Sequence, residues 1–461
     1  MNQSFLKQAL PHIVAILSFV LVSIIYFYPQ LSGESIRSSD TTLFQGMAKE
    51  SLDHKKETGE VTLWTNSMFG GMPTYQISSP ISNNVFRKIQ YGFYMGFGRP
   101  IGYFIFGSIT CYLMLLMFGV NPWLSISMAI GFSFMTNHVV LFEAGHMSKI
   151  LAIMSSPLIL GGLWSMFRKR LSIGFIAFTL GLGLNISANH IQMTFYFAMI
   201  LVVYFIMEAI QLMKQGQTPL LGKIVGICAV SCLIGLGASA SKMLPTYEYS
   251  KDTMRGSPIL TQTGTPTSSS ETDGLEFGYA MAWSNNFLEL FSSIIPRVVG
   301  GGASEKISSD SEFAKGVRKL GSRTEVGPMY WGELPFTVGP IYFGMIFFFL
   351  MTFGFFAMKG PIKWWVLFAL IFTLLLSMGK NCAVVNKTLF DYFPLFNKFR
   401  TPNSVLSVTA IFIPVLGGLV LQKLISSENK DSFFRPLLIS TGILSVVCLF
   451  FAFIGPGFSI S

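Results

Sequence analysis

The sequence predicts an all-α integral membrane protein with about eleven membrane-spanning helices, and three observations support this prediction. Hydrophobic residues make up 51% of the 461 residues and charged residues only 12%, about half the share that is usual in a soluble domain. The mean hydropathy is +0.56. Apolar runs of about 20 residues, the length that crosses a bilayer, recur along the chain. Lipid is therefore the expected solvent for most of this chain.

The net charge of +10 does not predict a nucleic-acid partner, because cytoplasmic loops of membrane proteins are rich in Lys and Arg. The first apolar run is followed by no small-residue cleavage pattern, so it is a retained span and not a signal peptide. Residues 101–142 and 171–207 contain no charged residue, and each is long enough for a hairpin of two spans. The eleven candidate spans are 9–28, 101–118, 122–140, 150–166, 172–187, 193–212, 223–241, 337–357, 363–378, 404–421 and 436–455.

The distribution of Lys and Arg predicts a cytoplasmic N-terminus. With this orientation the cytoplasmic segments hold eleven basic residues against two acidic ones. We treat the chain as one multi-span membrane domain, residues 1–461, with long outer loops at 31–98, 242–336 and 379–403. Loops longer than about 12–15 residues are usually functional or disordered, so we expect the chemistry on the outer face.

Three residues of the outer loops have the types that acid/base or metal chemistry needs. Asp40 follows the first span closely, so its carboxylate could take a proton from an acceptor hydroxyl or hold a divalent metal. The alternative is an N-cap of a short helix over 41–48. Glu143 and His146 are three residues apart in a short loop between two spans, where ionisable residues are rare and tend to be functional. With Asp40 they could form a metal site or an acid/base cluster; solvated loop residues are the alternative.

Lys398 and Arg400 alternate with aromatic residues just before the span at 404–421. Arg binds phosphate through two parallel hydrogen bonds and Lys acts as a point charge, so this segment suits a lipid-linked phosphate whose tail stays in the bilayer. Snorkelling anchors are the alternative. His190, Glu248 and Trp331 are candidate sugar or acceptor contacts, with structural packing as the alternative for each.

Eight stretches spread over nearly the whole chain together resemble the bacterial YfhO-like membrane protein family. These stretches are "SDTTLFQGMAKE", "LWTNSMFGGMPTYQIS", "GVNPWL", "EAGHMSKILAI", "ISANHIQMTFY", "TYEYSKDTMRG", "ELPFTVGPIYFG" and "FPLFNKFRTPNS". That family looks like a branch of the GT-C glycosyltransferases, which are multi-span enzymes that take a sugar from a polyprenyl-phosphate donor on the outer face of the membrane. The resemblance implies a GT-C-like helical bundle whose long extracytoplasmic loops carry short helices.

The resemblance also implies roles for single residues. The catalytic acid of the first outer loop corresponds to Asp40, a second acid to Glu143, and the phosphate-binding basic residues to Lys398 and Arg400. Independently of the resemblance, we expect Glu143 and His146 to bind a divalent metal, Mg or Mn, together with Asp40, or to orient the acceptor. The implied location is the inner membrane, and the implied partners are membrane lipids, a polyprenyl-phosphate-linked sugar, and an envelope glycan, lipid or protein acceptor.

Two alternatives to an enzyme stay open. A transporter or flippase of lipid-linked envelope precursors would place ionisable residues within the spans. A non-catalytic membrane scaffold would tolerate replacement of Asp40 and Arg400. Family members run well past 461 residues, so we expect the chain to lack further spans and an outer C-terminal domain.

Overall fold

The computed structural model describes residues 3–36, 38–77, 83–253, 255–256, 274–321 and 325–458. Helices make up 71% of the structure. In the described residues, seven helices are long and apolar enough to cross a membrane. An eighth span results if two consecutive helices, bent by 118° between Ser377 and Gly379, count as one. The chain is therefore a mainly α-helical membrane protein, as predicted.

Each predicted span coincides with an apolar helix, but four of these helices are short. They are α4 (Ile101–Met117), α8 (Leu171–Ser187), α13 (Met345–Ala357) and α14 (Ile362–Ser377), which is the first helix of the bent pair. The number of eleven spans and the sides of the loops therefore stay predictions. The longer spans contain α1 (Gln3–Tyr26), α5 (Pro122–Ser133) with α6 (Thr136–Glu143), α7 (Met147–Phe167), α9 (Ile191–Lys214), α10 (Thr218–Ser250), α16 (Leu406–Thr409) with α17 (Ile413–Ser426), and α18 (Phe434–Phe458).

Shorter elements lie in the segments between the spans. The helices are α2 (Ser39–Thr58), α3 (Val85–Phe93), α11 (Phe277–Ala280), α12 (Glu312–Lys319) and α15 (Ala383–Tyr392). Two small antiparallel pairs join β1 (Trp64–Thr65) to β2 (Met72–Pro73) and β3 (Glu305–Lys306) to β4 (Val326–Gly327). The predicted outer loops therefore carry short helices.

The contacts divide the chain into two compact units. The first unit is Met1–Phe134 with Leu141–Leu275, and the second is Met135–Val140 with Glu276–Ser461. The single membrane domain over residues 1–461 stays a prediction.

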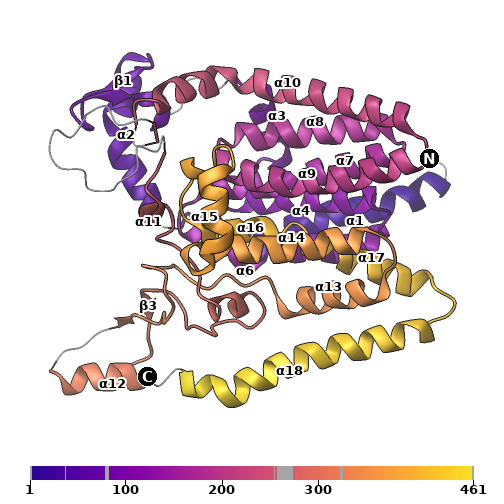
Figure 1. Ribbon diagram of the computed structural model, residues 1–461. Coiled ribbons are helices and arrows are strands. Elements are labelled where there is room, and N and C mark those ends of the chain that lie inside the picture. Colours follow the sequence, from indigo (N-terminus) through magenta and orange to yellow (C-terminus); the bar gives the residue numbers. More distant parts are fainter. Residues whose placement is uncertain are drawn as a thin grey trace. The chain divides into compact units, whose positions relative to one another are not determined.

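Close helix packing builds the first unit. Helix α7 packs against α4 and α8, and α8 packs against α10 (Figure 1). A Cβ on Gly162 of α7 would lie 2.4 Å from the backbone nitrogen of Phe178, and one on Gly181 of α8 would lie 2.7 Å from that of Ile159. Small residues therefore let the two backbones approach, as is common between helices in lipid.

Buried polar side chains connect α7, α8 and α9. The Nδ2 atom of Asn185 donates to the carbonyl of Ala152 at 2.7 Å and lies 3.3 and 3.2 Å from the hydroxyls of Ser155 and Ser156. The hydroxyl of Thr194 donates to Oδ1 of Asn185 at 2.6 Å. Because hydrocarbon offers no hydrogen-bond partners, these groups satisfy one another inside the bundle.

An ion pair links the end of α7 to α9. Arg168 donates to both carboxylate oxygens of Glu208, at 2.8 and 3.1 Å, and its guanidinium lies 3.9 Å from the centroid of the Trp164 ring. The hydroxyl of Tyr204 also donates to Glu208, at 3.1 Å. Glu208 is only 3% exposed, so its charge depends on these partners.

In the second unit α13 packs against α17 and α18, around Phe353, Val420 and Phe433. In this unit, two boundaries predicted from the sequence differ from those in the structure. The apolar run predicted over 337–357 is helical only from Met345, because Pro340 and the positive φ of Gly344 (101°) precede it. The predicted loop over 379–403 contains α15, which continues from α14 after the bend.

Candidate functional site

Asp40 lies in the first turn of α2 and does not cap it. The cap is Ser38, whose hydroxyl accepts the backbone N–H of Thr41 at 3.2 Å. The helix then runs to Thr58, well past the short helix expected over 41–48, so the capping alternative for Asp40 is wrong. Its carboxylate is half-exposed and available for another contact.

That contact is His146, which the loop before α7 brings to the start of α2. Nε2 of His146 lies 3.4 Å from Oδ2 of Asp40. Gly145 makes the approach possible: its φ is +92°, and a Cβ there would lie 2.7 Å from Cβ of Asp40 and 2.8 Å from the hydroxyl oxygen of Ser38. Glycine adopts such a φ without the cost that other residues incur.

Two further basic side chains interact electrostatically with this pair. Lys149, on the first turn of α7, is buried and interacts electrostatically with Asp40. His190 is the N-cap of α9, and its Nδ1 accepts the backbone N–H of Met193 at 3.4 Å. That contact leaves the proton of the neutral ring on Nε2. We refer to Asp40, His146, Lys149 and His190 as the Asp40 cluster.

Burial keeps both histidines of the Asp40 cluster neutral. It lowers the pKa of His146 to about 4, with the charge of Lys149 as a second cause. It lowers the pKa of His190 to about 3, again with Lys149 as the next cause. At neutral pH the carboxylate of Asp40 therefore faces a neutral imidazole and one buried ammonium group, and it can accept a proton.

The predicted metal ligands are only partly brought together. Glu143 is exposed and makes no ion pair with the described part of the chain. The described residues contain no group of three His, Cys, Asp or Glu side chains that could hold a metal ion. Asp40 and His146 alone, beside the positive charge of Lys149, fit a divalent cation poorly. The metal stays a prediction, and the mechanism below does not depend on it.

Gly145→Ala is expected to move Asp40 and to destabilise the protein by about 1–2 kcal/mol, because the new methyl group meets Asp40 and Ser38 and φ is strained. Thermal unfolding in detergent measures the change. Gly46→Ala is the matched control, since a Cβ there meets nothing within 4 Å in the interior of α2. It should stabilise the protein slightly, and equal destabilisation by both variants would contradict the close approach.

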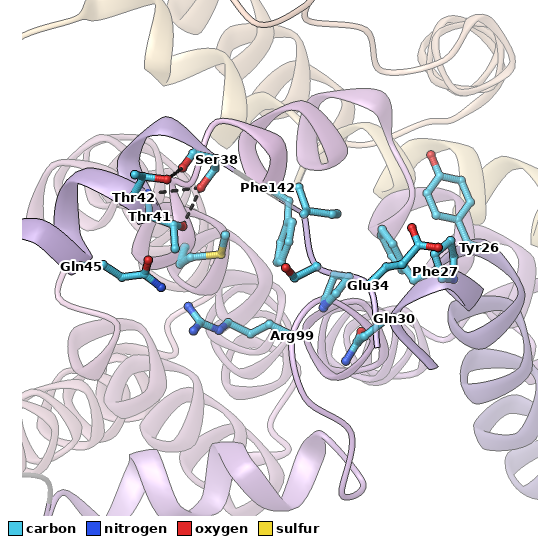
Figure 2. Close-up of a pocket in the computed structure, with 15 residues that line it drawn as sticks. Tyr26, Phe27, Gln30, Glu34, Ser38, Thr41, Thr42, Gln45, Arg99 and Phe142 are labelled. Carbon is cyan, nitrogen blue, oxygen red and sulfur yellow. Dashed lines mark hydrogen bonds between the residues drawn. The ribbon is translucent and has the colours of Figure 1, made fainter. Parts of the chain in front are cut away.

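A pocket of about 820 Å³ opens next to the Asp40 cluster, wholly within the first unit (Figure 2). Ser38, two residues before Asp40, and Met147, directly after His146, line it. Arg99, Gln30 and Gln45 also line it, and none of these three is a predicted site residue. One feature of the sequence could have identified Arg99: it is a basic residue directly before a span, on the predicted outer side of the membrane.

The other predicted site residues are divided between the units. In the first unit, Glu248 lies on α10 and pairs with Lys251 at 3.0 Å. In the second unit, Arg400 donates to the hydroxyl of Tyr279 and lies over its ring, 5.6 Å from the centroid. Lys398 ends a short helical turn close by in sequence, and Trp331 is 57% exposed. The structure therefore gathers Asp40, His146 and His190 but leaves the phosphate-binding role of Lys398 and Arg400 a prediction.

The second unit also holds a buried acid that the sequence did not single out. Glu289 accepts the hydroxyl of Tyr330 and the backbone N–H of Asn286, the latter at 2.7 Å. It borders a cavity of about 30 Å³, together with Ser292. Burial raises the pKa of Glu289 above its ordinary value of 4.5. No motif marks it, because its burial arises from the fold around it.

The raised pKa of Glu289 predicts a pH dependence of stability. Its contribution is fully present below about pH 4.5, where both states are protonated, and is lost as the pH rises through the higher folded-state pKa. Unfolding curves in detergent from pH 4 to 8 should therefore show a smaller loss for Glu289→Gln than for the wild type. Glu312→Gln, on exposed α12, should follow the wild-type curve. If Glu289→Gln follows it as well, the burial argument is wrong.

In comparisons with protein families, curated proteins and solved structures, nothing matches this chain. The resemblance to the YfhO-like family therefore stays an expectation based on the eight stretches of sequence.

Proposed function

We propose that the chain is a membrane glycosyltransferase that moves a sugar from a polyprenyl-phosphate donor to a cell-envelope acceptor on the extracytoplasmic face of the inner membrane. The observation that carries this proposal is the Asp40 cluster. A half-exposed carboxylate is held at the start of a helix, next to the end of several apolar spans, beside a neutral histidine and a large pocket.

In this proposal Asp40 is the general base. It accepts the proton of the acceptor hydroxyl while the hydroxyl oxygen attacks the anomeric carbon, and the polyprenyl phosphate leaves from the opposite face, so the configuration inverts. His146 fixes the orientation of the carboxylate. Lys149 interacts electrostatically with the same carboxylate. His190 and Glu248 would contact sugar or acceptor. The roles predicted from the sequence for Arg400, Lys398 and Trp331, which lie in the second unit, stay predictions.

The test is the incorporation of sugar into envelope fractions. Cells that lack the chain are compared with cells that carry the wild type at a measured membrane level, and the labelled glycan, lipid or protein is identified by mass spectrometry. Purified chain in vesicles with a polyprenyl-phosphate-linked sugar is the second arm. If neither arm gives a modified product, a transporter or a scaffold explains the chain better. Movement of the lipid-linked sugar across the membrane without transfer of the sugar would favour the transporter.

A further inference from the structure

The first-unit pocket combines one cation with a polar and an apolar wall. Among the described residues that line it, Arg99 is the one base and Glu34 the one acid. Figure 2 shows Arg99 extending toward Gln45, whereas Glu34 lies on the side of Phe27. Ser38, Thr41, Thr42, Gln30 and Gln45 form the polar wall, and Tyr26, Phe27 and Phe142 form the apolar wall.

The charge of Arg99 is available for a ligand. Its side chain is exposed, and within the part of the chain that the structure describes it takes part in no ion pair. Three helices also begin at the pocket. Ser38 caps α2, Pro100 precedes α4, and Met147 is the first residue of α7. Helix N-termini attract anions, so they add to the positive potential that Arg99 supplies.

The apolar side of the pocket lies at the end of a membrane span. The pocket begins at Tyr26, the last residue of α1. Exposed apolar residues follow one face of α1 toward that end, each between 51% and 62% exposed: Leu10, Ile13, Leu17, Leu21 and Ile25. Only 17% of the residues in the apolar stretch of α1 are buried. A hydrocarbon chain can therefore lie along α1 while a polar group attached to it occupies the pocket.

We propose that this pocket binds the phosphate of a lipid-anchored phosphate ester, with Arg99 as its charged ligand and the tail along α1. The inference rests on the proposed function, because it adds an anion site in the same unit as Asp40. It does not involve Arg400 or Lys398. The isoprenoid phosphate of the donor and an ordinary phospholipid share this chemistry, so the experiment separates them.

Binding is measured by native mass spectrometry of the purified chain in detergent, with undecaprenyl phosphate, dioleoyl phosphatidic acid, dioleoyl phosphatidylcholine and inorganic phosphate as probes. A hydrogen-bonded charge pair contributes about 1.5–3 kcal/mol, so Arg99→Ala should weaken binding of the lipid phosphate by about 10-fold or more. Arg99→Lys should restore part of it. Lys88→Ala, an exposed cation on α3 outside the pocket, should bind like the wild type.

Stronger binding of undecaprenyl phosphate than of phosphatidic acid assigns the site to the isoprenoid, and equal binding assigns it to lipid phosphate in general. Equal binding by Arg99→Ala and wild type, or by inorganic phosphate and the lipids, overturns the inference. A different result would contradict the proposed function alone. In that case the wild type binds the lipid phosphate in an Arg99-dependent way but transfers no sugar. Asp40→Asn should keep the binding, since Asp40 does not line the pocket.

Discussion

Asp40→Asn is expected to lower sugar transfer by about 10²–10⁴-fold, the usual contribution of a positioned general base. The amide has the shape of the carboxylate but cannot accept the proton of the acceptor hydroxyl. The cap of α2 is unaffected, because Ser38 supplies it. Membrane level and melting temperature should therefore stay close to those of the wild type. The measurement is the initial rate of transfer from a polyprenyl-phosphate-linked sugar by purified chain in vesicles.

Asp53→Asn is the matched control. Asp53 lies on the same helix, is half-exposed and pairs with Lys49, so its change removes the same charge without touching the Asp40 cluster. This variant should transfer at the wild-type rate. Wild-type transfer by Asp40→Asn would remove Asp40 from the chemistry, and equal loss in both variants would point to a general effect of charge near the membrane.

Arg168→Ala is expected to destabilise the protein by about 3 kcal/mol. This value is the low end of the range for breaking a buried ion pair, because the Arg168 side chain is itself 39% exposed. The loss arises mainly from Glu208, which stays buried and, among the described residues, keeps the hydroxyl of Tyr204 as its partner. Unfolding of the purified chain in mixed detergent, followed by tryptophan fluorescence and circular dichroism, measures it.

A second substitution separates this mechanism from lost packing on Trp164. The double variant Arg168→Ala, Glu208→Gln removes the uncompensated charge and should recover part of the stability. Lys214→Ala, at the exposed end of α9, should unfold with the wild type. If the double variant is no more stable than Arg168→Ala, then the stacking on Trp164 and not the charge of Glu208 carries the effect.

The helices of this chain could largely be predicted, because burial in lipid requires long apolar runs and leaves a clear pattern. The predicted and observed helices differ mainly at their ends. Gly344 delays the start of α13, and α10 continues to Ser250, nine residues past the predicted span, although Pro245 lies within it. Hydropathy measures composition over a window, and it does not locate the residue where a helix ends.

The candidate site could be predicted only in part. Asp40 and His146 were found because ionisable residues next to spans are rare, and the structure places them in contact. Their contact depends on the positive φ of Gly145, which no pattern of charges reveals. Arg99 and Glu289 escaped prediction for a related reason, since their significance comes from a pocket and from burial that distant segments create.

The hydrogen bonds of Asn185 have a consequence for biosynthesis. Its side-chain amide would be unsatisfied in hydrocarbon until the carbonyl of Ala152 and the hydroxyl of Thr194 are beside it. Helix α7 is synthesised before α8 and α9 after it, so α8 gains its partners from both sides as the chain grows. We expect α8 to leave the insertion machinery together with α7 and α9, as a group of three packed helices, and not as a single helix that diffuses in the bilayer.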